Sequence, residues 1–474
     1  MTRQDERLRF RGGAIGALLP LLVFLAGALT LGLSGAPDER GFWPIVLLAM
    51  VVGLVLADSS NRYSESVIAG MSDEVVAVMV AAWLLSGVVG ELVRQSGAVD
   101  YLVLGFVDLG VGPASFVCGA FVIAAIVGTS TGTAVGTVLI ATPVLFPVGM
   151  GLGAGPYWVL GAILGGGAFG DDFSPLSDTT IASAKTQKVE IDASVRSRAK
   201  YALVAAALAV FALGGGQYLS LSIELPPAAV VEAQTVSVGL REGLMLLGPA
   251  IVIVLCFLRV HLLAALLWGS VFMVAFGLIS GVFLASEIFR LDLENFSAQS
   301  IVIDGMSRGV GIAIFSILLI GLVRACLDSG VLEALLRKLQ AVSGSGKSRA
   351  EVCIVILTVT VNAMLAHNTI TLVAIGDFVK RLGEEAGIGG IRRANLIDLA
   401  GNTVMHILPY MITVLLASSV ANSLTEEGTV LTWKAGLYNF HSWALLLIVL
   451  LTASTGIWRQ RDEVRGQSGG GHGG

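Results

Sequence analysis

Residues 165–184, GGGAFGDDFSPLSDTTIASA, place three acids in a chain whose neighbouring segments are strongly apolar. The acids are Asp171, Asp172 and Asp178. Hydroxyl side chains crowd the same stretch, at Ser174, Ser177, Thr179, Thr180 and Ser183. A charged side chain at bilayer depth costs about 2.5–3.5 kcal/mol on insertion scales, so such residues usually mark an ion or proton pathway. Carboxylate and hydroxyl oxygens are hard ligands, which suit a hard cation better than zinc or copper.

The same stretch contains residues that interrupt helices. Gly165–Gly167 and Pro175 predict a break that leaves backbone carbonyl groups unpaired. Unwound backbone at membrane depth is tolerated only where it is buried in protein or lines a cavity. A solvated acidic loop is the alternative, but the flanking segments are too apolar to hold this stretch in bulk water. We therefore predict a cation site on an interrupted helix.

The composition is that of an integral membrane protein. Apolar residues make up 55% of the 474 residues, charged residues only 13%, and the mean hydropathy is +0.85. A soluble domain carries about 25% charged residues. The net charge of −5 comes without a basic patch and gives no indication of nucleic-acid binding. The four cysteines lie singly in apolar runs, so we expect neither a disulfide framework nor a resident metal or cofactor.

Apolar runs of about the 20 residues that a bilayer requires recur along the chain. We expect plain spans at residues 14–33, 42–57, 73–93, 201–220, 239–258, 262–283, 309–327 and 436–457. Interrupted segments are expected at residues 114–149, 156–184, 351–378 and 394–420. Whether 114–149 and 351–380 cross fully or re-enter stays open. A cleaved signal peptide is the alternative for residues 14–33, but that run is longer than a typical signal-peptide core and lacks a clear A-x-A site.

The distribution of Lys and Arg predicts an orientation, because short loops rich in these residues face the cytoplasm. Basic loops are expected inside at residues 185–200, 337–349, 380–393 and 459–465. The acidic loops 221–238 and 284–304 then fall outside. Residues 58–72 are expected inside but contain only one basic residue, so this loop does not support the orientation. The N-terminal segment 1–13 and the Gly-rich tail 459–474 are thereby predicted to be cytoplasmic. We expect a multi-pass protein of the bacterial inner (plasma) membrane.

An internal repeat is visible in the sequence. IAGMS at residues 68–72 recurs as IDGMS at residues 303–307, and each copy precedes an apolar helix, an interrupted pair and a broken helix. By the loop charges, the first copy starts inside and the second outside. Inverted repeats place the substrate site near the midplane, between discontinuous helices. We predict an all-α integral membrane protein with one transporter domain at residues 14–458. Its two inverted repeats, about 42–200 and about 262–458, bring interrupted helices and helical hairpins together at the midplane.

The run GDDFSPLSDTT at residues 170–180 resembles the signature of the NhaC-type sodium/proton antiporters. That family belongs to a larger ion-transporter superfamily of inverted-repeat carriers. It usually has Lys where this chain has Asp172 and Met where it has Phe173. Because this chain has an acidic residue where the family usually has a basic one, the ion stoichiometry stays open. The family includes sodium/proton exchangers and at least one organic-anion exchanger, so the resemblance implies the class of carrier more firmly than its substrate.

The repeat predicts where the other half of the site lies. In the second repeat, residues 367–369 correspond to the hairpin tip GTSTGT at residues 128–133. Residues 398–403 correspond to the break in GDDFSPLSDTT. Related carriers line a central cation site with two Asn-Thr pairs. The resemblance therefore implies ligands at Asn368, Thr369, Asn402 and Thr403. Where family members often have a Glu-Asp pair, this chain has Asp398 alone, which the resemblance makes the acid of this half.

These observations predict a secondary active transporter that exchanges Na⁺ for H⁺ by alternating access. A carboxylate in a partly desolvated site can hold either a proton or a cation, so competition for one site and alternating exposure together give exchange. Asp172 and Asp178 are the leading carriers, followed by Asp171. Ser174, Ser177, Thr179 and the two Asn-Thr pairs are expected to bind the cation or to orient its ligands. The expected partners are Na⁺, H⁺ and the lipid bilayer, without nucleic acid. A homodimer stays open.

There are three alternatives, of which the first is also a secondary transporter. Na⁺-coupled exchange or cotransport of a small organic anion or amino acid would be favoured by a guanidinium deep in the membrane, and we expect none in the proposed core. An intramembrane hydrolase would need a motif such as G-x-S-x-G or H-E-x-x-H, which is absent, so we do not expect an enzyme. A channel would differ from a carrier by a steady, uncoupled current.

Four further charged residues fall inside or next to predicted spans. Glu91 and Arg94 are expected to snorkel to the membrane interface. Arg324 and Asp328, spaced i and i+4, are expected to form a surface ion pair.

Two histidines accompany the second half of the site. His406 lies one turn after Asn402 and is either a hydrogen-bonded packing residue or part of the cavity wall. His367 lies at a hairpin tip and has either a proton-linked role or a structural hydrogen bond, because an imidazole titrates near neutral pH.

Overall fold

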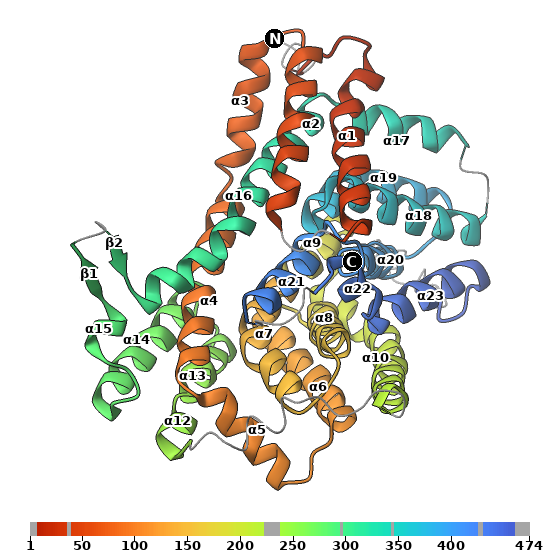
Figure 1. Ribbon diagram of the computed structural model, residues 1–474. Coiled ribbons are helices and arrows are strands. Elements are labelled where there is room, and N and C mark those ends of the chain that lie inside the picture. The colour runs from red at the N-terminus through yellow and green to blue at the C-terminus, as the bar shows by residue number, and fades with distance from the viewer. Residues whose placement is uncertain are drawn as a thin grey trace, which may run out of the picture.

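The chain is almost entirely helical in the computed structural model (Figure 1). The structure describes residues 7–35, 39–221, 238–293, 297–342, 346–424 and 430–459. Within these residues, ten helices are long and apolar enough to cross a membrane. The prediction of an all-α integral membrane protein is therefore confirmed. The first part of the predicted N-terminal segment, most of the outer loop at 221–238 and the tail beyond residue 459 lie outside the described residues.

The first half of the chain begins with helices that lead into the predicted hairpin and broken helix. These are α1 (Ala14–Leu33), the 3-10 helix η1 (Glu39–Phe42), α2 (Trp43–Leu56), α3 (Ser60–Met71), α4 (Glu74–Gln95) and α5 (Ala98–Asp108). The hairpin and broken helix follow as α6 (Pro113–Thr131), α7 (Ala134–Gly151), α8 (Pro156–Phe173), α9 (Asp178–Gln187) and α10 (Ile191–Leu221).

A connecting region joins the two halves through α12 (Leu240–Leu244), α13 (Leu247–Phe257), α14 (Leu262–Ser280) and α15 (Ala285–Ile288). The strands β1 (Arg290–Asp292) and β2 (Ser297–Gln299) pair antiparallel and form the only sheet among the described residues. This small hairpin lies in the predicted outer loop 284–304.

The second half repeats the order of the first. Its elements are α16 (Ile301–Asp328), α17 (Val331–Val342), α18 (Lys347–Leu365), α19 (Asn368–Glu385), α20 (Gly390–Val404), α21 (Ile412–Leu424), α22 (Thr432–Leu437) and α23 (Phe440–Thr455). In both halves a long helix and an amphipathic helix precede a hairpin and then a broken helix. One detail differs from the repeat prediction, because residues 303–307 lie inside α16 whereas residues 68–72 lie at the end of α3. The inverted orientation and the domain limits stay predictions.

The two hairpins have very short tips. Gly132 adopts a left-handed backbone conformation, with φ of 66°, between α6 and α7. Ala366 does the same, with φ of 51°, at the end of α18. Since one or two residues reverse the chain, the helices of each pair must run antiparallel and side by side, and both pairs are in contact. The interruptions predicted in residues 114–149 and 351–378 are confirmed.

The glycines of residues 165–167 do not break their helix, contrary to our expectation. Helix α8 runs through them to Phe173, and the chain leaves the helix only at Ser174, next to Pro175. The glycines instead let α6 approach closely. A Cβ added at Gly166 would lie 2.4 Å from the Phe121 carbonyl oxygen. Small residues have this role in membranes, where close backbone approach stabilises helix pairs.

Helices α4 and α16 also pack backbone to backbone. A Cβ at Gly305 would lie 2.6 Å from Val88 Cα, and one at Gly309 would lie 2.8 Å from the Trp83 carbonyl carbon. In Figure 1 these two helices run with α3 along one side of the molecule, and the hairpins and broken helices gather beside them. The interruptions of both halves therefore share one region of the fold.

Single cysteines at Lys188 and Leu293 are expected to label from opposite sides of the membrane. Both side chains are exposed, and the predicted topology places the first in the cytoplasm and the second outside. The test uses an impermeant maleimide on inside-out and right-side-out vesicles, with the four native cysteines replaced by serine. Reaction of Lys188→Cys and Leu293→Cys from the same side would contradict the inverted-repeat topology.

Candidate functional site

The two hairpin tips and the two helix breaks surround a cavity of about 490 Å³. The first half contributes Asp171, Asp178 and Thr179, and the second half contributes His367, Asn368 and Thr369. Thr133, at the first hairpin tip, and Asp73 and Glu74, at the start of α4, complete its polar lining. The structure therefore brings together residues from both predicted half-sites, which lie almost 200 positions apart in the sequence.

Asp171 is held by hydroxyl groups from beyond the helix break. Ser177 Oγ donates to Asp171 Oδ1 at 2.7 Å, and Thr179 Oγ1 lies 3.4 Å from Oδ2. The two hydroxyl oxygens are 2.8 Å apart. This arrangement follows from the chain path, because a turn at residues 174–177 brings the first turn of α9 back against the last turn of α8. Ser174 is buried within this turn, and its Oγ accepts from the Leu176 N–H at 3.2 Å.

Asp178 joins the two halves of the site. It lies in the first turn of α9, where the positive end of the helix dipole favours an acid. Thr369 Oγ1, from the start of α19, donates to Asp178 Oδ2 at 2.5 Å. Asp178 is exposed to the cavity, whereas Asp171 is buried behind it.

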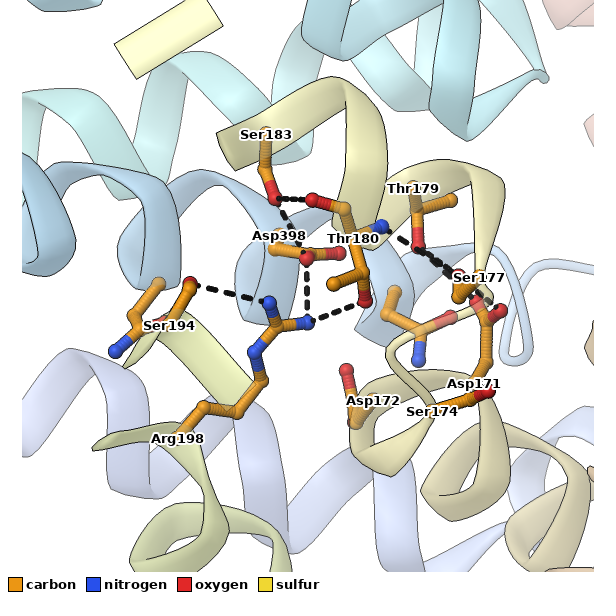
Figure 2. A network of polar contacts seen from close by, with 12 residues as sticks. Asp171, Asp172, Ser174, Ser177, Thr179, Thr180, Ser183, Ser194, Arg198 and Asp398 are labelled. Carbon is orange, nitrogen blue, oxygen red and sulfur yellow. Dashed lines mark hydrogen bonds and ion pairs between the residues drawn. The ribbon is translucent and has the colours of Figure 1, made fainter. Parts of the chain in front are cut away.

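Asp172 is the most buried of the three acids in residues 170–180. Its side chain is fully buried, and neither carboxylate oxygen has a hydrogen-bond partner within the described residues. His441 Nε2 lies 3.8 Å from Asp172 Oδ2. Asp172 interacts electrostatically with Asp398 and Arg198, and Figure 2 shows it beside this pair with no dashed line to either residue. A buried carboxylate without partners is unfavourable unless it takes up a proton or a cation.

Arg198 corrects two of our predictions. We expected residues 185–200 to form a basic loop and the core to lack a guanidinium. The segment instead forms the end of α9 and the start of α10, and Arg198 points inward with its side chain fully buried. It forms an ion pair with Asp398, which is also fully buried (Figure 2). The acid of the second half therefore already has a positive partner.

The two asparagines of the second half present unpaired amide oxygens. Asn402 Nδ2 donates to the Ala168 carbonyl at 3.0 Å, while its Oδ1 has no partner among the described residues. The same holds for Asn368 Oδ1, which lies so close to α20 that a Cβ at Gly401 would be 2.1 Å away. Thr403 Oγ1 donates to the Ala400 carbonyl at 2.7 Å within its own helix. The amides are thus better placed than the Thr403 hydroxyl to receive a cation.

Three histidines lie near the site. His406 Nδ1 is 2.7 Å from the Asn402 carbonyl oxygen, which favours the packing role. His367 lines the cavity, and its Nδ1 has no partner among the described residues. His441 was missed by sequence reasoning. It lies in an otherwise plain apolar span, α23, and no local pattern relates it to Asp172.

Most of the polar side chains that converge on the site present oxygen atoms. Within the described residues, no group of three or more His, Cys, Asp or Glu side chains is placed to hold a metal ion. The converging oxygens come from a mixture of carboxylates, hydroxyls and amides. Such hard, mostly neutral ligands suit a cation that must be released again.

Comparison with known proteins identifies the family. A family model described as the Na⁺/H⁺ antiporter family matches residues 17–216 and 217–457. The chain belongs to this family. The resemblance of residues 170–180 to the NhaC-type signature is therefore confirmed.

Relatives of this antiporter-family chain include two named Na(+)/H(+) antiporter NhaC. The one from Bacillus subtilis is 21% identical, covering 71% of this chain and 74% of that protein. The one from Alkalihalophilus pseudofirmus is 24% identical, covering 77% and 80%. The malate-2H(+)/Na(+)-lactate antiporter of B. subtilis is 27% identical over 55% of this chain, and the match spans 56% of that protein's length.

Two solved transporter structures are also similar to this member of the antiporter family. The YdaH transporter of Alcanivorax borkumensis is 16% identical, with 92% and 98% of the two chains covered and a TM-score of 0.38. MtrF of Neisseria gonorrhoeae, described as an antimetabolite efflux pump, is 13% identical, with 92% and 94% covered and a TM-score of 0.43. These scores are too low to support an argument about the site.

A second buried charge cluster in this antiporter-family fold corrects the expectation for Glu91. The Glu91 side chain is only 1% exposed and does not snorkel. Arg94 Nη2 lies 2.5 Å from Oε1, and Arg308 Nη2, from α16, lies 2.8 Å from Oε2. The predicted pair of Arg324 and Asp328 is present at 3.0 Å, and its arginine is 46% exposed.

Replacing Glu91 by Gln is expected to destabilise the protein by about 1–3 kcal/mol, because charge-assisted hydrogen bonds of a buried acid are lost while the two partly exposed arginines can still be solvated. The substitution leaves Arg94 and Arg308 without their shared acid. Thermal unfolding in detergent measures the effect. Arg324→Gln is the matched control, and it should cost at most about 1 kcal/mol because that pair is at the surface. Equal effects of the two substitutions would contradict the buried-cluster account.

Proposed function

We propose that the protein exchanges Na⁺ for H⁺ across the membrane by alternating access. The observation that supports this proposal is the charge of the residues that line the cavity. Four acids line it, and no Lys or Arg is among its lining residues; the acids are Asp73, Glu74, Asp171 and Asp178. A concave site lined by one sign of charge concentrates ions of the opposite sign, which here are cations.

We assign the cation ligands to two neighbouring groups. On the cavity side they are Asp171, Ser177, Asp178, Thr179 and Thr369, which the hydrogen bonds between α8, α9 and α19 hold together. Asn368, which also lines the cavity, adds an unpaired amide oxygen. Deeper in the protein the ligands are Asp172 and the unpaired amide oxygen of Asn402. Ser174 and Thr403 support the turns that carry these ligands, and Asp398 acts through its pair with Arg198.

Exchange follows from the cost of an empty site. A buried carboxylate without a partner is unfavourable, so Asp172 is occupied either by a proton or by Na⁺. Binding of one ion releases the other. The protein changes between its inward-open and outward-open states more readily when Na⁺ or a proton is bound. Without either ion, the site would keep an unbalanced negative charge while it is closed to water on both sides. Competition of the two ions for one site, together with a change of access only when the site is occupied, is sufficient for strict exchange.

A second candidate is Na⁺-coupled exchange of a small organic anion. Two observations favour it: the cavity volume of about 490 Å³ and the buried guanidinium of Arg198, although Asp398 already pairs with that guanidinium. One water molecule accounts for about 30 Å³ of liquid, so the cavity is far larger than a single ion needs. One relative is named as a malate/lactate antiporter. The acidic lining argues against an anion, because a carboxylate ligand would meet four carboxylates and only one histidine there.

Vesicles that contain the purified protein test the proposal. A pH gradient is established, and a pH-sensitive dye reports its collapse when Na⁺, Li⁺, K⁺ or lactate is added. We expect Na⁺ to collapse the gradient without lactate. Collapse that requires lactate would favour the second candidate, and no response to any cation would contradict antiport. The proposal includes a bacterial inner-membrane location with both termini in the cytoplasm, and it leaves open whether the carrier works as a monomer or a homodimer.

A further inference from the structure

Arg198 is held in place by three helices. Its Nη1 donates to Thr180 Oγ1, on α9, at 3.0 Å and forms the ion pair with Asp398 Oδ2, on α20. Its Nη2 lies 3.3 Å from Ser194 Oγ, one turn earlier on its own helix α10. Both charged side chains are fully buried. Figure 2 shows the guanidinium between the two broken-helix segments, so Arg198 joins the two halves of the site.

The surroundings of Asp398 fix its orientation as well. Ser183 Oγ donates to the same carboxylate oxygen, Oδ2, at 2.8 Å. Ser194 Oγ, which contacts Arg198, donates to Asn395 Oδ1 on α20 at 2.8 Å. Two serines on two helices thus support the pair from both sides. These contacts hold one carboxylate oxygen, Oδ2, while Asp398 Oδ1 and Arg198 Nε have no hydrogen-bond partner within the described residues.

We propose that Arg198 is the resident counter-charge of the transport site. It is a positioning residue that keeps Asp398 out of the exchange reaction and sets how many negative charges meet the transported cation. This inference rests on the proposed function. A guanidinium does not lose its proton in proteins, so Arg198 supplies one fixed positive charge opposite the Asp398 carboxylate. Asp172, which interacts with both members of the pair, is then the deep acid that exchanges.

The alternative is that Asp398 itself takes up Na⁺ or a proton and that Arg198 moves away during the cycle. The packing argues against it. Helices α9, α10 and α20 contact one another pairwise, so both members of the pair and their serines lie in one packed unit. No rearrangement between units is needed to keep the pair intact.

The test compares Arg198→Gln, Asp398→Asn and the double variant Arg198→Gln/Asp398→Asn in vesicles with a clamped membrane potential. Na⁺-driven H⁺ flux and its reversal potential are measured. Each single substitution leaves one buried charge unpaired beside Asp172. We expect the flux to fall about thirtyfold or more in both. The double variant restores the wild-type net charge, so we expect flux within about threefold of wild type and an unchanged reversal potential.

A double variant as inactive as Asp398→Asn, with wild-type thermal stability, would overturn the inference, because Asp398 would then have a role of its own. Wild-type flux in the Asp398→Asn single variant would also overturn it. Absence of Na⁺-driven flux in the wild-type protein would instead contradict the proposed function. In that case the melting temperatures of the variants test the role of the Arg198–Asp398 pair. The inference requires each single variant to have a lower melting temperature than the double variant.

Discussion

Replacing Asp172 or Asp178 by Asn is expected to reduce Na⁺-driven H⁺ movement to the level of protein-free vesicles. Asn preserves the volume of Asp and one carbonyl oxygen, but it carries neither the negative charge nor the exchanged proton. Asp172 is the buried acid without hydrogen bonds, and Asp178 is the acid that faces the cavity and bonds to Thr369. Asp171→Asn should behave in the same way, because its carboxylate accepts from Ser177.

The two leading variants should differ in stability. Asp172→Asn removes a buried charge that has no partner within the described residues, so its melting temperature should equal or exceed that of the wild type. Asp178→Asn weakens a hydrogen bond at the helix start and should be slightly less stable. Asp192→Asn is the control, because Asp192 is an exposed acid at the start of α10, and it should leave exchange unchanged. Normal exchange by both core variants would contradict the carboxylate mechanism.

Local signals explain why much of the site was predictable from the sequence. Acids and hydroxyls next to Pro175 indicated a functional break, and the chain does leave its helix there. The internal repeat related that break to residues 398–403 and the first hairpin tip to residues 367–369. Both second-half segments lie beside the first-half break, as the repeat required. Spacing and order carried this information without any knowledge of contacts.

The remaining features depend on contacts between distant residues. Arg198 has the sequence surroundings of a cytoplasmic loop, and only its pair with Asp398, 200 positions away, gives it a place in the core. His441 meets Asp172 in the same way. The burial of Glu91 requires Arg308 from another long helix. Gly165–Gly167 were misjudged for a related reason, because the close approach of α6 decides their role and local helix propensity does not.

A shared site also makes Na⁺ affinity depend on pH. Protons and Na⁺ compete for the same carboxylates, so falling pH protonates the site and weakens Na⁺ binding. For a single exchanging acid the limit is about tenfold in apparent affinity per pH unit, or about 1.4 kcal/mol. Asp171 interacts electrostatically with Asp178 and Asp172, and competition at interacting acids can give a steeper dependence than this limit for one acid. Asp172→Lys should flatten the dependence, because it removes the deep acid from the competition.

The most direct test of this account is the apparent Na⁺ affinity for exchange, measured in vesicles from about pH 6 to about pH 9 with the same pH on both sides. Competition at shared carboxylates predicts that the affinity weakens about tenfold for each unit of falling pH over the range in which the site titrates. It also predicts that saturating Na⁺ restores the full Na⁺ uptake at each pH. An affinity that stays constant across this range, in a protein that still exchanges Na⁺ for H⁺, would mean separate sites for the two ions and would contradict the account.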